Sequence, residues 1–177
     1  MDDDLDFDRL GRDEEAATTP SPAAPAAPSA DPLGRVSVGE VIAAGYDSFT
    51  AESFRLHDLP PLGGVVVVEN VLGVVYEART EGLGPLSVRG GPADADGAVY
   101  RAYPDLERTL RSQFSALIIG HYSGMPQSGA SLPRVVYTYP DSPPRVHYKA
   151  GLAGEAELRH VTEQPQYLRL LLQVPEW

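Results

Sequence analysis

Hydrophobic and polar positions divide the sequence into a β-rich part and an α-rich end. Between residues 34 and 80, short apolar runs are separated by Gly, Pro, Asn and Asp, with a turn expected at residues 69–72. Closely spaced short strands of this kind are typical of a small antiparallel barrel or sandwich. We expect four strands, at residues 34–45, 49–54, 63–70 and 72–80.

The valines give the clearest details of these strands. Val36, Val38 and Val41 should lie near one face of the first strand, with Gly39 at a bulge. The run Val65–Val68 is apolar at every position, which is typical of a strand that is buried on both faces. The prolines and glycines just before this run predict the turn that starts the strand.

The hydrophobic period changes in the middle of the chain. Residues 81–99 are rich in glycine and proline, so we expect a long loop there. The apolar positions beyond it are spaced by four, four and three residues: Leu106, Leu110, Phe114 and Leu117. This spacing predicts a short amphipathic helix in residues 104–117, leading directly into a buried strand at residues 114–122.

The C-terminal part should hold two more extended segments and two short helices. The extended segments are expected at residues 134–140 and 145–150, and the helices at residues 154–161 and 165–174. Leu168, Leu171 and Leu172 should pack the second helix on the strands. The sequence therefore predicts a mostly β fold with minor α, in which a small antiparallel β-barrel is followed by short C-terminal helices.

The domain organisation follows from composition. We place the barrel at residues 33–150, with the loop 81–99 as an insertion, and a helical extension packed on it at residues 151–177. Residues 1–32 are acidic first and then rich in Ala and Pro, which predicts a disordered tail. Its only large apolar residues are Leu5, Phe7 and Leu10. The tail either acts only as a solvated segment or docks on a partner through these side chains.

Charge is concentrated in this tail. The chain carries a net charge of −11, and residues 1–32 contribute −7 of it, with nine acidic residues against two arginines. The other 145 residues carry only −4 and show no basic stripe, so direct binding of nucleic acid or of an anionic membrane is disfavoured. There is no cysteine, no apolar run long enough to span a bilayer and no secretory signal, so we expect a cytoplasmic protein.

Motifs for nucleotide or metal chemistry are missing from the sequence. A P-loop needs a glycine pattern that ends in lysine, and the only lysine, Lys149, follows no such pattern. The acidic run at residues 94–97 has its glycine at the wrong position for a calcium loop. We therefore expect no cofactor, no metal and no catalytic residue. A hydrolase built on His57 with Asp58, or on His121, is kept as a third hypothesis.

Aromatic residues are the candidates for partner binding. Tyr137, Tyr139 and Tyr148 lie on predicted strands without a basic groove around them, so they line a barrel face or a protein contact. Trp177 joins them as a candidate contact at the last position. The alternative is a barrel that binds a small ligand or nucleic acid, with these tyrosines and the loop 81–99 as its mouth.

Several of the predicted elements also resemble those of a known protein family. The stretches GRVSVGEVIAAGYDSFTAES, LPPLGGVVVVEN and LGVVYEART resemble the HAS-barrel domain, which HerA-type ATPases share with rotary ATP synthase subunits. The later segments LRSQFSALIIGHYSG, RVVYTYPDSPPRVHYKA and EAELRHVTEQPQYLRLLL are similar to free-standing bacterial HAS-barrel proteins, notably of cyanobacteria. The likeness covers most of residues 34–173.

The resemblance implies a fold and a role rather than a catalytic site. In HerA-like motors the barrel precedes the ATPase core and mediates ring and partner contacts, and this chain lacks the Walker motifs of that core. The resemblance thus implies an accessory barrel that docks on a partner protein, such as a HerA-like ring ATPase or an associated nuclease. Barrel edges and the C-terminal helix leave self-association into a homo-oligomer open.

Overall fold

The computed structural model describes most of the chain. The described residues are 33–82, 88, 90–127, 129 and 131–173. The predicted tail at residues 1–32, part of the predicted loop insertion and Trp177 lie outside them. None of the helices in this described part is long and apolar enough to cross a membrane.

Strands dominate the described part, which confirms the prediction of a mostly β fold with few helices. The strands are β1 (Ser37–Ala44), β2 (Ser48–Ser53), β3 (Val65–Val68), β4 (Val71–Gly82), β5 (Leu110–Tyr122), β6 (Val135–Val136) and β7 (Lys149–Leu152). The helical elements are α1 (Ala98–Ala102), the 3-10 helix η1 (Pro104–Thr109), α2 (Glu155–Thr162) and α3 (Tyr167–Leu171).

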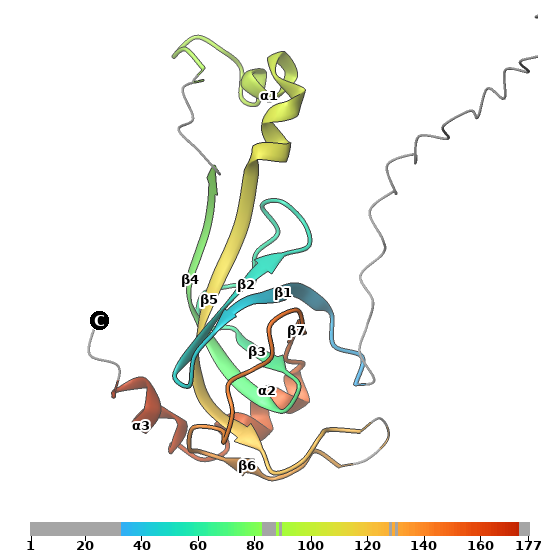
Figure 1. Cartoon of the computed structure of the whole chain (residues 1–177), viewed down its shortest axis with the longest axis vertical. Helices are drawn as coiled ribbons and strands as arrows, with labels where there is room; N and C mark the ends of the chain where they lie inside the picture. Colours follow the sequence, from blue (N-terminus) through green and yellow to red (C-terminus); the bar gives the residue numbers. More distant parts are fainter. Residues whose placement is uncertain (1–32, 83–87, 89, 128, 130, 174–177) are drawn as a thin grey trace, which may run out of the picture.

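Six of the strands close into a ring. Hydrogen-bonded neighbours follow the order β2-β1-β7-β3-β4-β5, and β5 pairs in turn with β2. Every pairing is antiparallel. The short β6 adds to the end of β5, and α2 and α3 follow the last strand (Figure 1). The closed antiparallel arrangement with C-terminal helices is the architecture that the sequence predicted.

The interior of the ring is an apolar core. Alternate residues of each strand point inward, as the period of two in a strand requires. The buried members are Val41, Phe49, Ala51, Val66, Val68, Val71, Val75, Phe114, Ala116, Ile118 and Ala150. All six strands of the ring contribute side chains to this core. The hydrogen bonds between neighbouring strands therefore enclose it.

β1 follows the predicted pattern in part. Val41 is fully buried and Val38 packs against the interior core, but Val36 lies before the strand and is 54% exposed, so its predicted place was wrong. The pairing of β1 with β7 shifts register just before Gly39, which confirms the predicted bulge. A Cβ at Gly39 would lie 2.5 Å from the carbonyl oxygen of Glu52, so the paired strand leaves no room for a side chain.

β3 is buried on both faces, as predicted. All four of its valines are buried, and they alternate between the ring interior and a second core outside the ring. Val68 pairs with Val71, so the turn that follows has two residues and is shorter than the predicted turn at 69–72. The turn before β3 is also observed, since the Gly64 amide donates to the carbonyl of Pro61 at 2.9 Å.

β4 and β5 continue beyond the ring as a two-stranded arm that carries α1 and η1 (Figure 1). Their pairing extends to Gly82 opposite Leu110. The helix predicted for residues 104–117 was therefore wrong beyond Thr109, where the chain is already a strand. A spacing of four places Leu110 and Phe114 on one face of a strand as well as of a helix, so the pattern did not discriminate.

The second core lies outside the ring, where α2 and α3 cover one end of the strands. Its buried members are Val65, Val67, Leu72, Ile119, Tyr122, Val135, Ala153 and Val161. α3 packs on it through Tyr167 and Leu171, and Leu170 of the same helix is buried. Leu168 and Leu172, which were predicted to pack, are 44% and 83% exposed. We call this cluster the outer core.

The chain after β5 is less regular than predicted. The strand expected at residues 134–140 is reduced to the two residues of β6. In the extended segment expected at 145–150 the strand begins at Lys149, although His147 and Tyr148 already make backbone hydrogen bonds with Val41 of β1. Gly120 allows β6 to lie directly against β5, because its φ is +150° and a Cβ there would lie 2.6 Å from the carbonyl oxygen of Val136.

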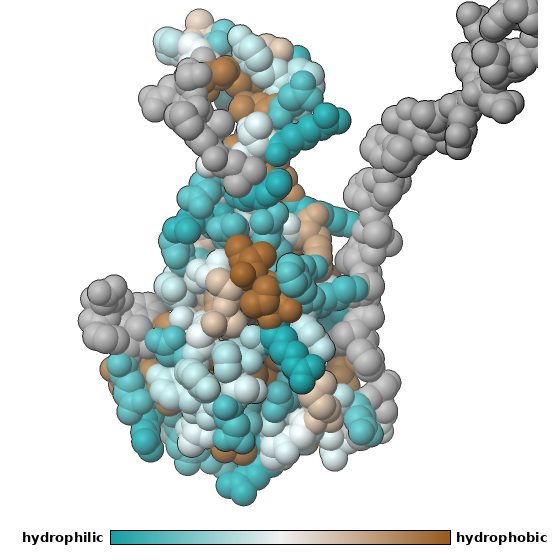
Figure 2. Space-filling model, viewed as in Figure 1, coloured by the Kyte–Doolittle hydropathy of each residue, from teal (hydrophilic) through white to brown (hydrophobic). Residues whose placement is uncertain are grey.

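One face of the ring shows an apolar patch over β1 and β2 amid mostly hydrophilic surface (Figure 2). Ile42 in β1 and Phe54 just after β2 are 38% and 51% exposed. Exposed apolar side chains are common on protein surfaces, so this patch identifies no partner by itself.

Candidate functional site

A buried salt bridge ties the start of the fold to α2. Arg35 donates from Nε and Nη2 to the two carboxylate oxygens of Glu157, at 2.9 and 2.8 Å. Both side chains are 7% exposed. The hydroxyl of Tyr122 and the amide of Gly154 also donate to this carboxylate, at 3.1 and 3.4 Å. A buried charge is tolerated only with such compensation, so the cluster holds α2 in one position.

Tyr122 connects this cluster to the surface. Burial raises its pKa above the ordinary value of 10.0, and the charge of Glu157 adds to the effect, so the phenol stays protonated and donates. Its ring stacks on His160, with 6.4 Å between ring centroids and 16° between planes. The Nε2 of His160 lies 2.9 Å from the carbonyl oxygen of Pro133, which links α2 to the segment before β6.

A groove of about 710 Å³ opens at His160. Residues 132 and 134–137 form one wall, and five residues between His160 and Arg169, from the α2–α3 corner, form the other. Val135 is buried in the outer core, and the hydroxyl of Tyr137 donates to the carbonyl of Val161 across the two walls at 2.9 Å. The groove is thus the place where the helices leave the outer core incompletely covered.

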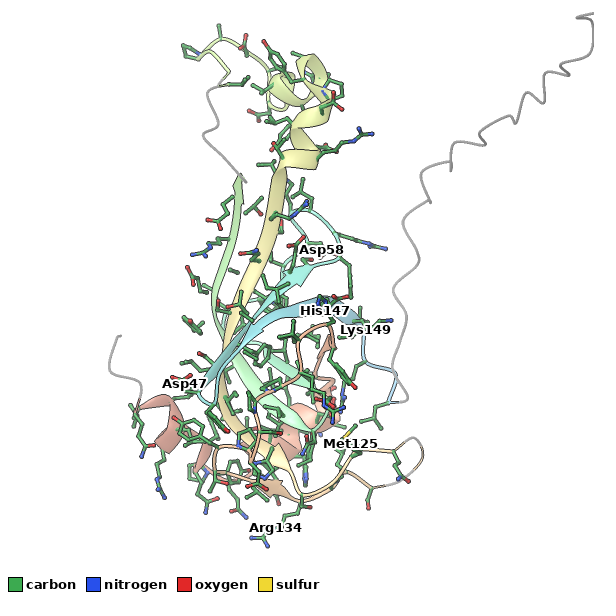
Figure 3. All side chains as sticks on the ribbon, in the orientation of Figure 1. Asp47, Asp58, Met125, Arg134, His147 and Lys149 are labelled. Carbon is green, nitrogen blue, oxygen red and sulfur yellow. The ribbon has the colours of Figure 1, made fainter. Side chains whose placement is uncertain are left out.

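The groove holds the two described arginines whose side chains have neither a carboxylate nor a backbone carbonyl as partner. Ten arginines are described, and eight of them bind a carboxylate or a backbone carbonyl. The other two are Arg134 and Arg169, which lie on opposite walls. Figure 3 shows the side chain of Arg134 at the base of the molecule, pointing away from the ring.

This combination defines what the groove can bind. Its described lining combines apolar side chains such as Leu132 and Val135 with neutral polar groups, two arginines and one carboxylate, Glu163. Arginine makes bidentate hydrogen bonds to carboxylates and phosphates, which gives both strength and orientation. The matching ligand therefore carries apolar groups beside negative charges.

The predicted contact tyrosines do not form one surface. Tyr137 lies in the groove and packs on the outer core, while Tyr139 packs on the core inside the ring. Tyr148 is exposed and accepts a hydrogen bond from Arg145 at 3.0 Å. Its sequence neighbours His147 and Lys149 lie midway up the molecule, away from the base (Figure 3). Of the three, only Tyr137 belongs to the groove, and Trp177 lies outside the described residues.

The histidines of the hydrolase hypothesis have no hydroxyl partner at their rings among the described residues. The ring of His57 meets the edge of Tyr100 at 6.4 Å between centroids, and only its backbone amide reaches the hydroxyl of Ser112, at 2.8 Å. The Nδ1 of His121 lies 3.2 Å from the carbonyl oxygen of Thr138. This geometry gives the hydrolase hypothesis no support.

No group of three or more His, Asp or Glu side chains in the described ranges is placed to hold a metal ion. The groove arginines were missed in the sequence, although a signal was present. Neither Arg134 nor Arg169 has an acidic residue within four positions, whereas Arg159 follows Glu155 by four. An acid four positions away pairs with a helical arginine such as Arg159, and neither Arg134 nor Arg169 has such a local partner.

No protein-family model matches the chain, and a comparison with curated proteins found no match.

Proposed function

We propose that the chain is a non-enzymatic protein-interaction module whose groove, between the β6 segment and the α2–α3 corner, binds an acidic segment of a partner protein. The observation that carries this proposal is the position of Arg134 and Arg169. Theirs are the two described arginine side chains with neither a carboxylate nor a backbone carbonyl as partner, and both line the same groove of mixed polar and apolar residues.

The energetics of such a contact come from two sources. Apolar side chains of the partner that cover the groove floor contribute about 25 cal/mol per Å² of buried apolar area. The guanidinium groups add charge-assisted hydrogen bonds that fix the orientation of the segment. Since residues 33–177 carry a net charge of −4, an acidic partner is repelled elsewhere and guided toward the groove.

The first partner class to test is a HerA-like ring ATPase or an associated nuclease in the cytoplasm. The closed antiparallel ring followed by helices is the architecture expected of a free-standing HAS-barrel protein. This step rests on likeness of fold, which suggests a partner class without specifying a site.

A small anionic ligand is the second candidate. The groove volume of about 710 Å³ lies within the range of small-molecule sites. A ligand at 100 times its Kd stabilises the fold by about 2.7 kcal/mol, which a thermal-shift titration detects. A shift with phosphorylated or carboxylated metabolites that disappears in Arg134→Gln/Arg169→Gln supports this alternative.

Site-specific photocrosslinking in the native host tests the main proposal. A benzophenone amino acid replaces Gln166 in the groove, and in a matched protein it replaces Tyr103, which is 54% exposed near the tip of the arm. We expect a crosslinked protein from Gln166 that is absent from Tyr103. Mass spectrometry should place the crosslink in an acidic segment of that protein.

The arginine pair provides the second control. Arg134→Gln/Arg169→Gln should abolish the crosslink from Gln166, whereas Arg55→Gln/Arg108→Gln removes the same charge from exposed pairs elsewhere and should leave it intact. Identical products from both labelled positions, or products that survive the loss of the groove arginines, would refute the proposal.

A further inference from the structure

We propose that residues 2–15 of this same chain bind in the groove and cover it until a partner displaces them. This inference rests on the groove assigned above as an acidic-peptide site. It adds the identity of one occupant and makes access to the groove self-regulated.

The chemistry of residues 2–15 matches the groove. The segment DDDLDFDRLGRDEE holds eight acidic residues and two arginines, with Leu5, Phe7 and Leu10 as apolar anchors. The groove offers the apolar side chains Leu132 and Val135 together with Arg134 and Arg169. No other stretch of the sequence carries so many acidic residues around large apolar side chains.

The first residues of the described fold lie against the helix that lines the groove. The chain enters the fold at Arg35, whose guanidinium is fixed to Glu157 of α2. Three residues further along the same helix, His160 lines the groove. Three helical residues correspond to about 4.5 Å of rise. The attachment point of residues 1–32 is therefore tied to the helix that forms one wall.

The connecting stretch is long enough. The 17 residues 16–32 separate the acidic segment from the fold. At about 3.1 Å per residue in an extended proline-rich chain, they span up to about 50 Å. A tether of this kind gives an effective concentration on the order of 1 mM. Self-docking is then populated when the free segment binds the groove with a Kd tighter than about 1 mM.

Paramagnetic relaxation in the full-length chain tests this proposal. The sequence has no cysteine, so Ala16→Cys accepts a single nitroxide label beside the acidic segment. We expect strong broadening of the amide signals of Val136, Tyr137 and His160 at the groove. The amides of Arg79 and Glu81 on the arm should be affected only weakly.

Two variants separate docking from random contact. Leu5→Ser/Phe7→Ser/Leu10→Ser and Arg134→Gln/Arg169→Gln should each restore the groove signals, whereas Arg55→Gln/Arg108→Gln should leave the broadening unchanged. Broadening that is weak everywhere, or that persists without the groove arginines, overturns self-docking.

The outcome is distinguishable from failure of the proposed function. If the segment does not dock but Gln166 still crosslinks an acidic partner, the groove is a partner site without self-regulation. If the segment docks and no partner crosslinks even in Leu5→Ser/Phe7→Ser/Leu10→Ser, the groove serves only the chain itself and the proposed function fails.

Discussion

The two apolar cores of this protein are closed in different ways. The ring interior is lined by strand residues and sealed by the pairing of β2 with β5. The outer core is covered by α2, α3 and the β6 segment, and needs the buried Arg35–Glu157 pair to hold α2 in place. β3 contributes two valines to each core, so this one strand lies between the two cores.

The difference explains where a binding surface arises. The core inside the ring is enclosed by paired strands, and the groove lies outside it, beside the outer core. Helices of eight and five residues are too short to be stable alone and depend on tertiary contacts. They cover the outer core incompletely, and the groove with Arg134 and Arg169 lies at this incomplete edge.

Val67→Asp should have the largest effect on stability, and it tests whether the outer core is needed for folding. Val67 is 1% exposed and faces the outer core. A carboxylate buried there without a partner should cost at least about 4–5 kcal/mol. We expect no folded population by circular dichroism, whereas Val146→Asp, at a 44% exposed position, should unfold like the wild type. A Val67→Asp protein with wild-type melting would show that the outer core does not contribute to the cooperative fold.

Glu157→Gln tests whether the buried salt bridge with Arg35 holds α2 in place. Removal of the charge deprives the buried Arg35 guanidinium of the Glu157 carboxylate, which should cost about 3–5 kcal/mol in urea unfolding. Glu155→Gln, whose side chain is 80% exposed on the same helix, should change stability by about 0.5 kcal/mol or less. Arg35→Met/Glu157→Leu should recover most of the loss. Equal effects of the two glutamine variants would contradict a structural role of the pair.

Alkaline pH should weaken the outer core. Burial raises the pKa of Tyr122, and burial with the nearby charge of Glu163 raises that of Tyr137. Both phenols ionise first in the unfolded chain, so the stability they contribute is complete below pH 10 and falls as the pH rises above it. The slope is at most about 1.4 kcal/mol per pH unit for each tyrosine. Urea unfolding between pH 8 and 11 should show a shallower decline in Tyr122→Phe; an unchanged decline would exclude Tyr122 as a contributor.

Arg134→Gln/Arg169→Gln should have the smallest effect on stability. Both guanidinium groups lack a charge partner in the described structure, so their loss should change the free energy of unfolding by about 0.5 kcal/mol or less. Thermal unfolding provides the measurement. A large destabilisation would mean that the arginines support the fold, and would remove the argument that they serve binding.

Sequence patterns gave correct predictions where the spacing of hydrophobic residues fits only one type of secondary structure. The uninterrupted apolar run Val65–Val68 predicted a strand buried on both faces, and the position of Gly39 predicted a bulge. The prediction was wrong where the spacing fits both a helix and a strand, as it does for Leu110 and Phe114, which lie in β5. It also failed in α3, where nearly continuous leucines leave the buried face of a short helix undetermined.

The groove could not be predicted because it depends on relations between distant segments. Arg134 and Arg169 are 35 positions apart, and only folding brings them to one site. Their lack of local acidic neighbours was visible in the sequence, but whether a distant carboxylate neutralises them depends on the tertiary structure. Glu157 illustrates the opposite case, since its partner Arg35 lies 122 positions away.

A peptide titration tests the central claim, that the groove is a site for acidic segments with apolar anchors. The acceptor is the full-length chain carrying Leu5→Ser/Phe7→Ser/Leu10→Ser, which leaves the groove unoccupied in this account. A fluorescein-labelled peptide of residues 2–15 is titrated by fluorescence anisotropy. We expect saturable binding with a Kd tighter than about 1 mM, weakened by salt and lost in Arg134→Gln/Arg169→Gln but kept in Arg55→Gln/Arg108→Gln. Binding that is absent, or that is equal with and without the groove arginines, would contradict the account.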